Sequence, residues 1–185
     1  TTHLCVIDGE GNAVSLTNTI MSAFGSGFIP KKTGVILNNG MMWFDPRPNR
    51  VNSILPGKYP LNNMSPALVM DSDGVKLAVG ASGGRRITNC VTQVINNILD
   101  FSMSPQQAID VPRSDCSGLS VNLDSRLDSK VVEGIKNKGH AIHLIDAVFD
   151  PTGMSGFASP IAITRNKNIL NAGVDTFHSA FAKGY

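Results

Sequence analysis

The first nineteen residues constrain the fold more than any other stretch of this chain. Two runs rich in β-branched or alternating apolar residues, 1–7 and 13–19, flank the turn formers Asp8-Gly9-Glu10-Gly11-Asn12. This pattern predicts an antiparallel hairpin with a five-residue connection. If Ile7 pairs with Ala13, Thr1 faces Thr19 on the same side of the hairpin, with Cβ atoms about 4.5–5.5 Å apart.

A threonine at a chain start carries a hydroxyl and a free α-amine on neighbouring carbons. The hydroxyl can attack a carbonyl group, and the amine, with an ordinary pKa of about 7.7–8.0, can take the proton. Because the sequence has no initiator Met, we expect a processing site before Thr1. The alternative is that a Thr stands at this position by accident. The hairpin favours a chemical role, since it ties the terminus into a sheet and places Thr19 beside it.

Composition bounds the remaining possibilities. The chain has 185 residues, of which 42% are hydrophobic, which is enough for one domain, residues 1–185, with a substantial core. A net charge of +2 is too small to indicate a nucleic-acid partner. The sequence contains no run of 18 apolar residues, so we expect no membrane span.

The cysteines and histidines do not form an obvious metal or disulfide framework. The three cysteines, Cys5, Cys90 and Cys116, are odd in number and lack metal-ligand spacing, so we expect buried free thiols. His140 and His143 have an odd spacing on a predicted strand and therefore point to opposite faces. We expect neither a metal nor a cofactor.

Strands dominate the predicted secondary structure. The longest helix is expected over residues 86–101, where apolar residues recur at steps of three and four. Residues 40–65 contain four prolines and predict a long ordered loop, which in compact domains is usually functional. We predict an α+β layered sandwich with strands in antiparallel pairs. The expected strands are 1–7, 13–19, 34–38, 67–70, 75–80, 119–123, 140–145, 156–164 and 169–170, and the expected helices are 86–101, 105–109 and 130–137.

The segment Gly80-Ala81-Ser82-Gly83-Gly84 lies between a predicted strand and the long helix. Its G-x-S-x-G spacing is that of a serine nucleophile elbow, for which Asp146 and His178 follow in the required order. An elbow sits in a parallel sheet, however, whereas the strand before Ser82 is expected to form a hairpin with residues 67–70. The backbone N–H groups of the two glycines could instead bind an oxyanion at the head of the helix. A tight turn without chemical function is the third interpretation.

Two arginines stand next to this turn. Arg85 and Arg86 could bind a carboxylate substrate through paired hydrogen bonds. They could equally be solvated residues at the start of the helix.

Short motifs spread over the whole chain carry a family resemblance. They are Thr1-Thr2-His3, Asp8, Gly11-Asn12-Ala13-Val14-Ser15, Thr17-Asn18-Thr19, Phe24-Gly25-Ser26-Gly27, Gly34-Val35-Ile36-Leu37-Asn38-Asn39, Pro60-Leu61, Met64-Ser65-Pro66, Val79-Gly80, Gly83-Gly84, Ala108, Pro112-Arg113 and Gly184-Tyr185. Together they resemble the small subunit of γ-glutamyltranspeptidase. The resemblance implies an N-terminal nucleophile hydrolase with an αββα sandwich of antiparallel sheets between helix layers. It also implies a precursor that cuts itself before Thr1 and a partner, the large N-terminal subunit.

The resemblance assigns roles to individual residues. Thr1 would be the nucleophile and its amine the base, Thr19 the hydroxyl that orients Thr1, and Gly83 and Gly84 the oxyanion hole. Asn62 and Asn63 occupy the place of paired serines that hold the α-carboxylate of the substrate.

Three departures from the family pattern bear on the substrate. In the members that act on glutathione, the α-amine of the γ-glutamyl unit is held by an Asn, a Gln or Glu, and an Asp. The corresponding residues here are Met21, Gly40 and Trp43, which cannot pair with an ammonium group, and burying that charge unpaired is costly.

A glutamyl unit whose α-amine is already acylated, as in poly-γ-glutamate, fits better. The sequence resembles the capsule depolymerase branch of the family, which cuts this polymer and transfers it to the cell wall. We therefore expect a γ-glutamyl hydrolase and transpeptidase, secreted or at a bacterial cell surface, with water or an amine as acceptor. The alternatives are a conventional γ-glutamyltranspeptidase, a glutaryl-type β-lactam acylase, a serine hydrolase at Ser82 and a silent binding module.

Overall fold

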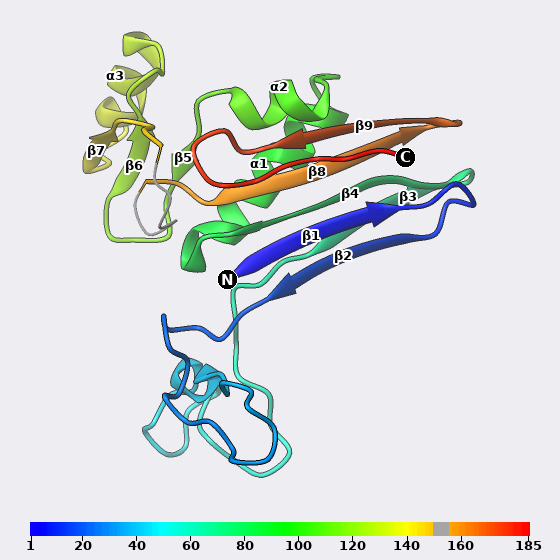
Figure 1. Cartoon of the computed structure of the whole chain (residues 1–185). Coiled ribbons are helices and arrows are strands. Elements are labelled where there is room, and N and C mark those ends of the chain that lie inside the picture. The colour runs from blue at the N-terminus through cyan, green and yellow to red at the C-terminus, as the bar shows by residue number, and fades with distance from the viewer. Residues whose placement is uncertain (150–155) are drawn as a thin grey trace.

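The computed structural model describes residues 1–149 and 156–185 and has a layered α+β architecture (Figure 1). The strands in this part of the chain are β1 (Thr2–Ile7), β2 (Ala13–Asn18), β3 (Ala67–Asp71), β4 (Gly74–Ser82), β5 (Ser114–Asp115), β6 (Val121–Asp124), β7 (Ile142–Ile145), β8 (Ser159–Asn166) and β9 (Ile169–Val174). The α-helices are α1 (Ile87–Leu99), α2 (Pro105–Asp110) and α3 (Ser129–Asn137).

The first two strands form the predicted hairpin in the predicted register. β1 and β2 pair antiparallel from Thr2 opposite Asn18 to Ile7 opposite Ala13. Asp8 organises the turn, because its Oδ1 accepts the backbone N–H groups of Glu10 and Asn12, each at 2.9 Å. The turn at Asp8 therefore fixes the register of the two strands.

The central sheet has the strand order β3-β4-β8-β9, with every pair antiparallel. The β1–β2 hairpin packs across β4 and β8 without joining their hydrogen-bond ladder. The two layers are joined by a hydrogen bond of 2.8 Å from Ser15 Oγ to the carbonyl of Val79. Gly80 makes this approach possible, since a Cβ at that position would lie 2.1 Å from the His3 ring.

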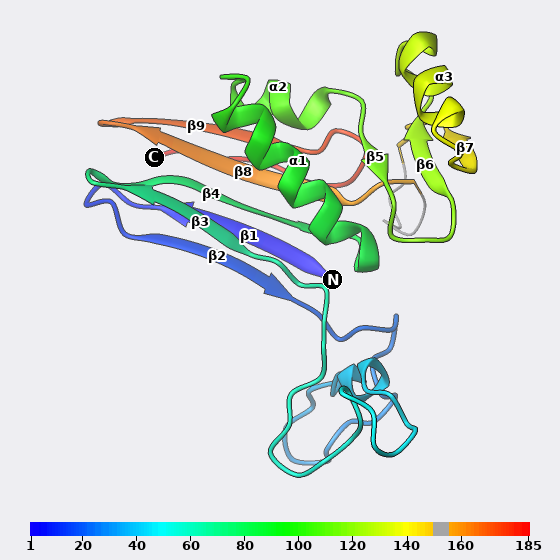
Figure 2. The same cartoon turned by 180° about the vertical axis from the view of Figure 1, so that it is seen from behind.

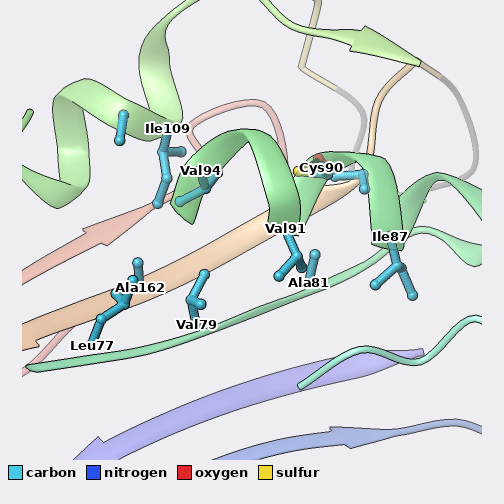
Figure 3. Packing of buried hydrophobic residues seen from close by; sticks show 11 residues of the cluster. Leu77, Val79, Ala81, Ile87, Cys90, Val91, Val94, Ile109 and Ala162 are labelled. Atoms are coloured by element: carbon cyan, nitrogen blue, oxygen red, sulfur yellow. Dashed lines mark hydrogen bonds between the residues drawn. The ribbon is translucent and has the colours of Figure 1, made fainter. Parts of the chain in front are cut away.

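Helices α1 and α2 cover the other face of the central sheet (Figure 2). Ile87, Val91 and Val94 of α1 point into the core, as the helical period predicted, and Val94 and Leu77 of β4 are completely buried. Figure 3 shows how these side chains meet between helix and sheet. Burial of this apolar face is what fixes the helix on the sheet.

The two shorter helices begin and end within one residue of the predicted boundaries. Ser104 caps α2, accepting the N–H of Gln107 at 3.4 Å while Gln107 Oε1 accepts the N–H of Ser104 at 3.0 Å. Gly139, with φ of 87°, follows the end of α3. No helix in residues 1–149 or 156–185 has the length and apolar character of a membrane span.

Two predictions about strands were wrong, namely that all strands pair antiparallel and that residues 34–38 form a strand. In the third sheet, of order β5-β6-β7, strands β6 and β7 are parallel, which is possible because α3 forms the crossover between them. The two-residue strand β5 is too short to leave a pattern in the sequence.

Residues 34–38 were predicted to form a strand and are irregular. Leu37 hydrogen-bonds with Ser26 and Phe28 of the glycine-rich segment before it, so no ladder forms. Residues 40–65 form the predicted long loop, apart from a 3₁₀ turn at Gly40–Trp43 and an isolated bridge between Asp45 and Ser53. The loop projects away from the sheets (Figure 1).

One layer of the expected αββα sandwich is not present among the described residues. The sheets and the helix layer of α1 and α2 are in place, but no described helix covers the outer face of the β1–β2 hairpin. Side chains on that face are 43–51% exposed and apolar, namely Leu4, Val6, Val14 and Leu16.

Candidate active site

The hairpin brings two threonine hydroxyls together at its open end. Thr1 Oγ1 lies 2.8 Å from Thr19 Oγ1, one position beyond the last paired residues of β1 and β2. The backbone N–H of Met21 also donates to Thr19 Oγ1, at 2.9 Å. Because Met21 adopts a left-handed conformation, with φ of 73°, the chain turns back and fixes the Thr19 hydroxyl from both sides.

Thr1 lies in a large cleft, which we call the main cleft. Its volume is about 700 Å³. The cleft brings Thr1 together with four further predicted site residues, and its lining comprises Thr1, Met21, Ser22, Ala23, Ser82, Gly83, Gly84, Arg85, Arg86, Asp115, Ser117, Gly118 and Asn122.

The two glycines form a sharp turn in this cleft. Gly83 and Gly84 have φ values of 137° and 61°, a region that favours glycine. At Gly83 a Cβ would also lie 2.6 Å from the backbone of Ala158. Neither glycine N–H donates to another group among the described residues. These two N–H groups belong to the lining of the cleft that Thr1 also lines, and can therefore bind an oxyanion there.

Neighbouring side chains clamp the carbonyl groups of the same turn. Arg86 Nε donates to the carbonyl of Gly83 at 3.1 Å, and its Nη1 donates to the carbonyl of Gly156. Asn63 Nδ2 donates to the carbonyl of Gly84. Arg86 and Asn63 thus hold the turn in shape, whereas Arg85 is exposed and lines the main cleft.

Other residues singled out from the sequence lie outside the lining of this cleft. Asn62 is exposed and its Oδ1 accepts the N–H of Met64 at 3.0 Å. Gly40 is buried against Trp43, whose ring would lie 3.1 Å from a Cβ at Gly40. Of the three departures from the family pattern, the structure places Met21 in the main cleft.

The surroundings of Ser82 differ from those of a nucleophile elbow. Ser82 ends β4 and pairs with Ser159 of the antiparallel strand β8, so the parallel sheet of an elbow is missing here. His178 Nδ1 lies 3.3 Å from Asp175 Oδ2, and Asp146, its expected partner, is exposed. The hydrogen bonds of residues 1–149 and 156–185 include none between Ser82 and His178.

Asp115 is a residue that sequence reasoning missed. It lines the main cleft and is only 3% exposed. Its carboxylate accepts the side chains of Ser117 and Asn89, at 2.9 and 3.2 Å. No pattern in the sequence identifies it, because it lies on the two-residue strand β5.

A second cleft meets the main cleft at Thr1 and Ser82. It has a volume of about 400 Å³ and lies between β1, β8 and the C-terminal segment. Its lining comprises Thr1, Thr2, His3, Leu4, Cys5, Ser82, Ser159, Ile161, His178, Ser179, Ala180 and Phe181. Sequence reasoning did not anticipate it, because its walls come together only through the packing of the two sheets.

Burial between the sheets changes the titration of two groups near this cleft. Desolvation lowers the pKa of His3 from its usual 6.5 to about 4 and raises the pKa of the Cys5 thiol to about 11.

Cys5, Cys90 and Cys116 are free, as predicted. The prediction that the thiols are buried is confirmed for Cys90, whereas Cys5 is half-buried and Cys116 is exposed. The described residues contain no cluster of His, Cys, Asp or Glu that could hold a metal ion.

Comparison with known sequences gives a match over the full length of the chain. The family described as Gamma-glutamyltranspeptidase matches residues 1–185. Among curated proteins, the "Acylase ACY 1 proenzyme" of Pseudomonas sp. (strain SE83) is 37% identical over 142 residues. That match covers 77% of this chain and 25% of the acylase, so the chain corresponds to about a quarter of the length of that relative.

Solved structures show the same fold. The γ-glutamyltranspeptidase from Pseudomonas nitroreducens, complexed with L-DON, superposes with a TM-score of 0.83 at 29% identity, and all of both chains is covered. The Bacillus anthracis transpeptidase enzyme CapD superposes with a TM-score of 0.74 at 25% identity, again over all of both chains. The layered α+β fold, whose hairpin and central sheet are antiparallel, is therefore that of the N-terminal nucleophile hydrolases of this family.

Proposed function

The chain belongs to the γ-glutamyltranspeptidase family, and from this premise we propose that it is the catalytic small subunit, residues 1–185, of a γ-glutamyl hydrolase and transpeptidase with Thr1 as nucleophile. The observation that carries the proposal is the 2.8 Å contact between the hydroxyls of Thr1 and Thr19. Thr1 also lines the main cleft, together with Gly83 and Gly84.

The proposed reaction has an acylation half and a deacylation half. The Thr1 hydroxyl oxygen attacks the γ-carbonyl carbon, and its proton passes to the α-amine of Thr1. The N–H groups of Gly83 and Gly84 stabilise the oxyanion. The tetrahedral intermediate then loses the amine leaving group, which takes the proton back from the Thr1 ammonium, and a γ-glutamyl ester remains. Water or an amine attacks this ester and gives its proton to the same α-amine. The Thr1 ammonium then returns the proton to the departing Thr1 oxygen, which restores the free hydroxyl and the free amine.

Thr19 supports this chemistry by orienting the nucleophile. Its hydroxyl is fixed by the Met21 N–H at 2.9 Å, and it can direct the Thr1 oxygen toward the substrate. A well-oriented nucleophile converts a loose encounter into a near-attack geometry. No metal or cofactor takes part in the proposed steps.

We propose poly-γ-glutamate as the substrate. Met21 in the main cleft offers no partner for a free α-ammonium group, and the Asp115 carboxylate on the same lining already accepts hydrogen bonds from Ser117 and Asn89. An acylated α-amine carries no charge and needs no such partner. Every unit of the polymer has a free α-carboxylate, which Arg85 on the wall of the cleft can bind. Because the chain is similar to both the P. nitroreducens γ-glutamyltranspeptidase and CapD, the choice of substrate rests on Met21 and Arg85 of the main cleft. Such a polymer is available to a secreted or cell-surface bacterial enzyme.

We also propose that a large subunit from the same precursor covers the exposed apolar surfaces of this chain. The outer hairpin face, with Leu4, Val6, Val14 and Leu16, is one such surface. The segment after the hairpin presents another, with Phe24, Phe28 and Met42 at 76%, 59% and 66% exposure. Apolar surfaces of this kind usually contact another protein.

The nucleophile is tested by intact-mass analysis of the two-subunit enzyme after reaction with a slow γ-glutamyl donor. We expect one acyl adduct on residue 1, a weakly active Thr1→Ser variant and an inactive Thr1→Ala variant. An adduct on Ser82, or normal turnover by Thr1→Ala, would contradict the proposal and support the serine hydrolase.

The substrate is tested by comparing poly-γ-glutamate with a γ-glutamyl anilide and with a glutaryl-β-lactam. We expect the polymer to be cleaved fastest, and we expect Met21→Asn to improve kcat/KM for the anilide. Fast turnover of the anilide alone would indicate a conventional γ-glutamyltranspeptidase. Preference for the β-lactam would indicate an acylase, the alternative that the 37% identity to ACY 1 favours.

A further inference from the structure

Arg113 is a buried cation at the point where three segments of the chain meet. Its Nη1 donates to the carbonyl of Ile109 in α2, at 2.7 Å. Its Nη2 donates at 3.2 Å to the carbonyl of Ala158, just before β8, and lies 3.3 Å from Oδ2 of Asp175, which follows β9. The guanidinium group therefore joins α2, β8 and the C-terminal segment beyond β9.

The same aspartate oxygen also binds a histidine. His178 Nδ1 lies 3.3 Å from Asp175 Oδ2, and the N–H of Phe177 donates to Asp175 Oδ1 at 2.7 Å. A carboxylate only accepts hydrogen bonds, so Nδ1 of His178 carries the proton in this contact. In the neutral ring Nε2 is then an acceptor.

One polar atom of each side chain is left over. Nε of Arg113 and Nε2 of His178 are sealed from solvent and have no hydrogen-bond partner within residues 1–149 and 156–185. The two side chains are only 6% and 10% exposed. Nε is a donor and Nε2 an acceptor, yet they do not pair with each other. Because a buried polar atom without a partner is unfavourable, the fold favours a group that accepts from one and donates to the other.

Both residues line one small cavity. Its volume is about 20 Å³, and Asp175, Phe157 and Phe177 contribute to its wall beside Arg113 and His178. A cavity can hold a water molecule when it offers at least about 10–15 Å³ and two to four polar partners. This cavity therefore has room for one water molecule, and its wall includes two residues that each have an unpaired polar atom.

We propose that the cavity is the binding site of one internal water molecule, which accepts a hydrogen bond from Arg113 Nε–H and donates one to His178 Nε2. Water suits this pair because it is donor and acceptor at once, whereas a halide ion has no hydrogen for Nε2. The water completes the contacts that hold the start of the C-terminal segment, and residues 179–181 of that segment line the second cleft together with Thr1.

The test is the crystal structure of the two-subunit enzyme, at a resolution that shows ordered waters, for wild type, His178→Phe and His143→Phe. Crystals are soaked in bromide, so that a halide ion in the cavity is recognised by its anomalous signal. His143 is exposed on β7 and does not line the cavity, so it is the matched control. Relaxation dispersion of ¹⁷O in water counts the long-lived internal waters of the same proteins in solution.

In wild type we expect one density peak at about 2.7–3.2 Å from both Arg113 Nε and His178 Nε2, without a bromide signal. His178→Phe should lose this peak and one long-lived water, because the phenyl ring fills the place of the imidazole but offers no acceptor. His143→Phe should keep both.

Several results would overturn the water site. They are a cavity without density, direct pairing of Arg113 with His178, a large-subunit side chain on either atom, and a bromide peak in the cavity. A folded His178→Phe variant that keeps the peak and the number of long-lived waters would also overturn it. The wild-type structure decides the question if His178→Phe does not fold. None of these readouts depends on activity, so the water site and the proposed function fail independently.

Discussion

The pairing of Thr1 with Thr19 makes a residue-level prediction. Replacing Thr19 by Val removes the hydroxyl 2.8 Å from Thr1 Oγ1 and leaves the Met21 N–H without its acceptor. We expect kcat to fall about 10- to 100-fold, because the nucleophile loses its orientation. Steady-state kinetics with a γ-glutamyl ester measures this. Thr33→Val is the control, because Thr33 is exposed in the segment between β2 and the 3₁₀ turn and lines neither cleft. A Thr19→Val enzyme with wild-type kcat would contradict the role.

His3 gives a second residue-level prediction, on pH. Burial holds the pKa of His3 in the folded protein at about 4, below the usual 6.5. Between pH 4 and 6.5 the unfolded chain therefore carries a proton on His3 that the folded protein does not. The free energy of unfolding should therefore decrease as pH falls from 6.5 to 4, by at most about 1.4 kcal/mol per unit from this group. Urea unfolding at several pH values measures the slope. A His3→Gln variant should lose this contribution, and an unchanged slope would refute the assignment.

At the level of elements, the contact between the hairpin and the central sheet depends on Gly80. A Cβ at this position would lie 2.1 Å from the His3 ring, and both residues are buried between the layers. We expect Gly80→Ala to destabilise the protein by about 1–3 kcal/mol, the cost of overpacking, and to reduce activity by displacing β1.

Gly134 is the matched control for this change. It lies inside α3, and nothing is within 4 Å of a Cβ there. Gly134→Ala should stabilise the protein by about 0.5–1 kcal/mol, because alanine favours the helix. Thermal and urea unfolding distinguish the two variants. Equal stability of both would show that the hairpin does not pack on β4 as described.

At the level of the whole molecule, the outer hairpin face is predicted to be covered by the large subunit. Leu4 and Leu16 are directly paired on this face and are 43% and 47% exposed. Replacing both by Lys would place charges in an apolar interface, so we expect weaker association of the subunits at little cost to the fold of this chain.

Co-purification of the two subunits from the expressed precursor measures this association. Leu119→Lys is the control, because Leu119 is fully exposed and lies outside the hairpin face. Full retention of the large subunit by the double variant would show that this face is not the interface.

The sequence alone determined the parts of this protein that depend on local chemistry. The alternating runs around Asp8 predicted the hairpin and its register, and the apolar period of α1 predicted its buried face. The register in turn placed Thr1 beside Thr19, because two antiparallel strands joined by a short turn leave little freedom. The motifs along the chain indicated the family.

Tertiary structure decided what depends on contacts between distant segments. The parallel pairing of β6 and β7 and the short strand β5 have no local signature. Asp115 and His178 reach the clefts only because strands and C-terminal segment pack together, and Arg86 and Asn63 bind carbonyl groups of the glycine turn rather than standing free for a ligand. Spacing along a chain fixes neighbours within a hairpin or a helix, whereas the shape and lining of a cleft are set by how whole layers meet.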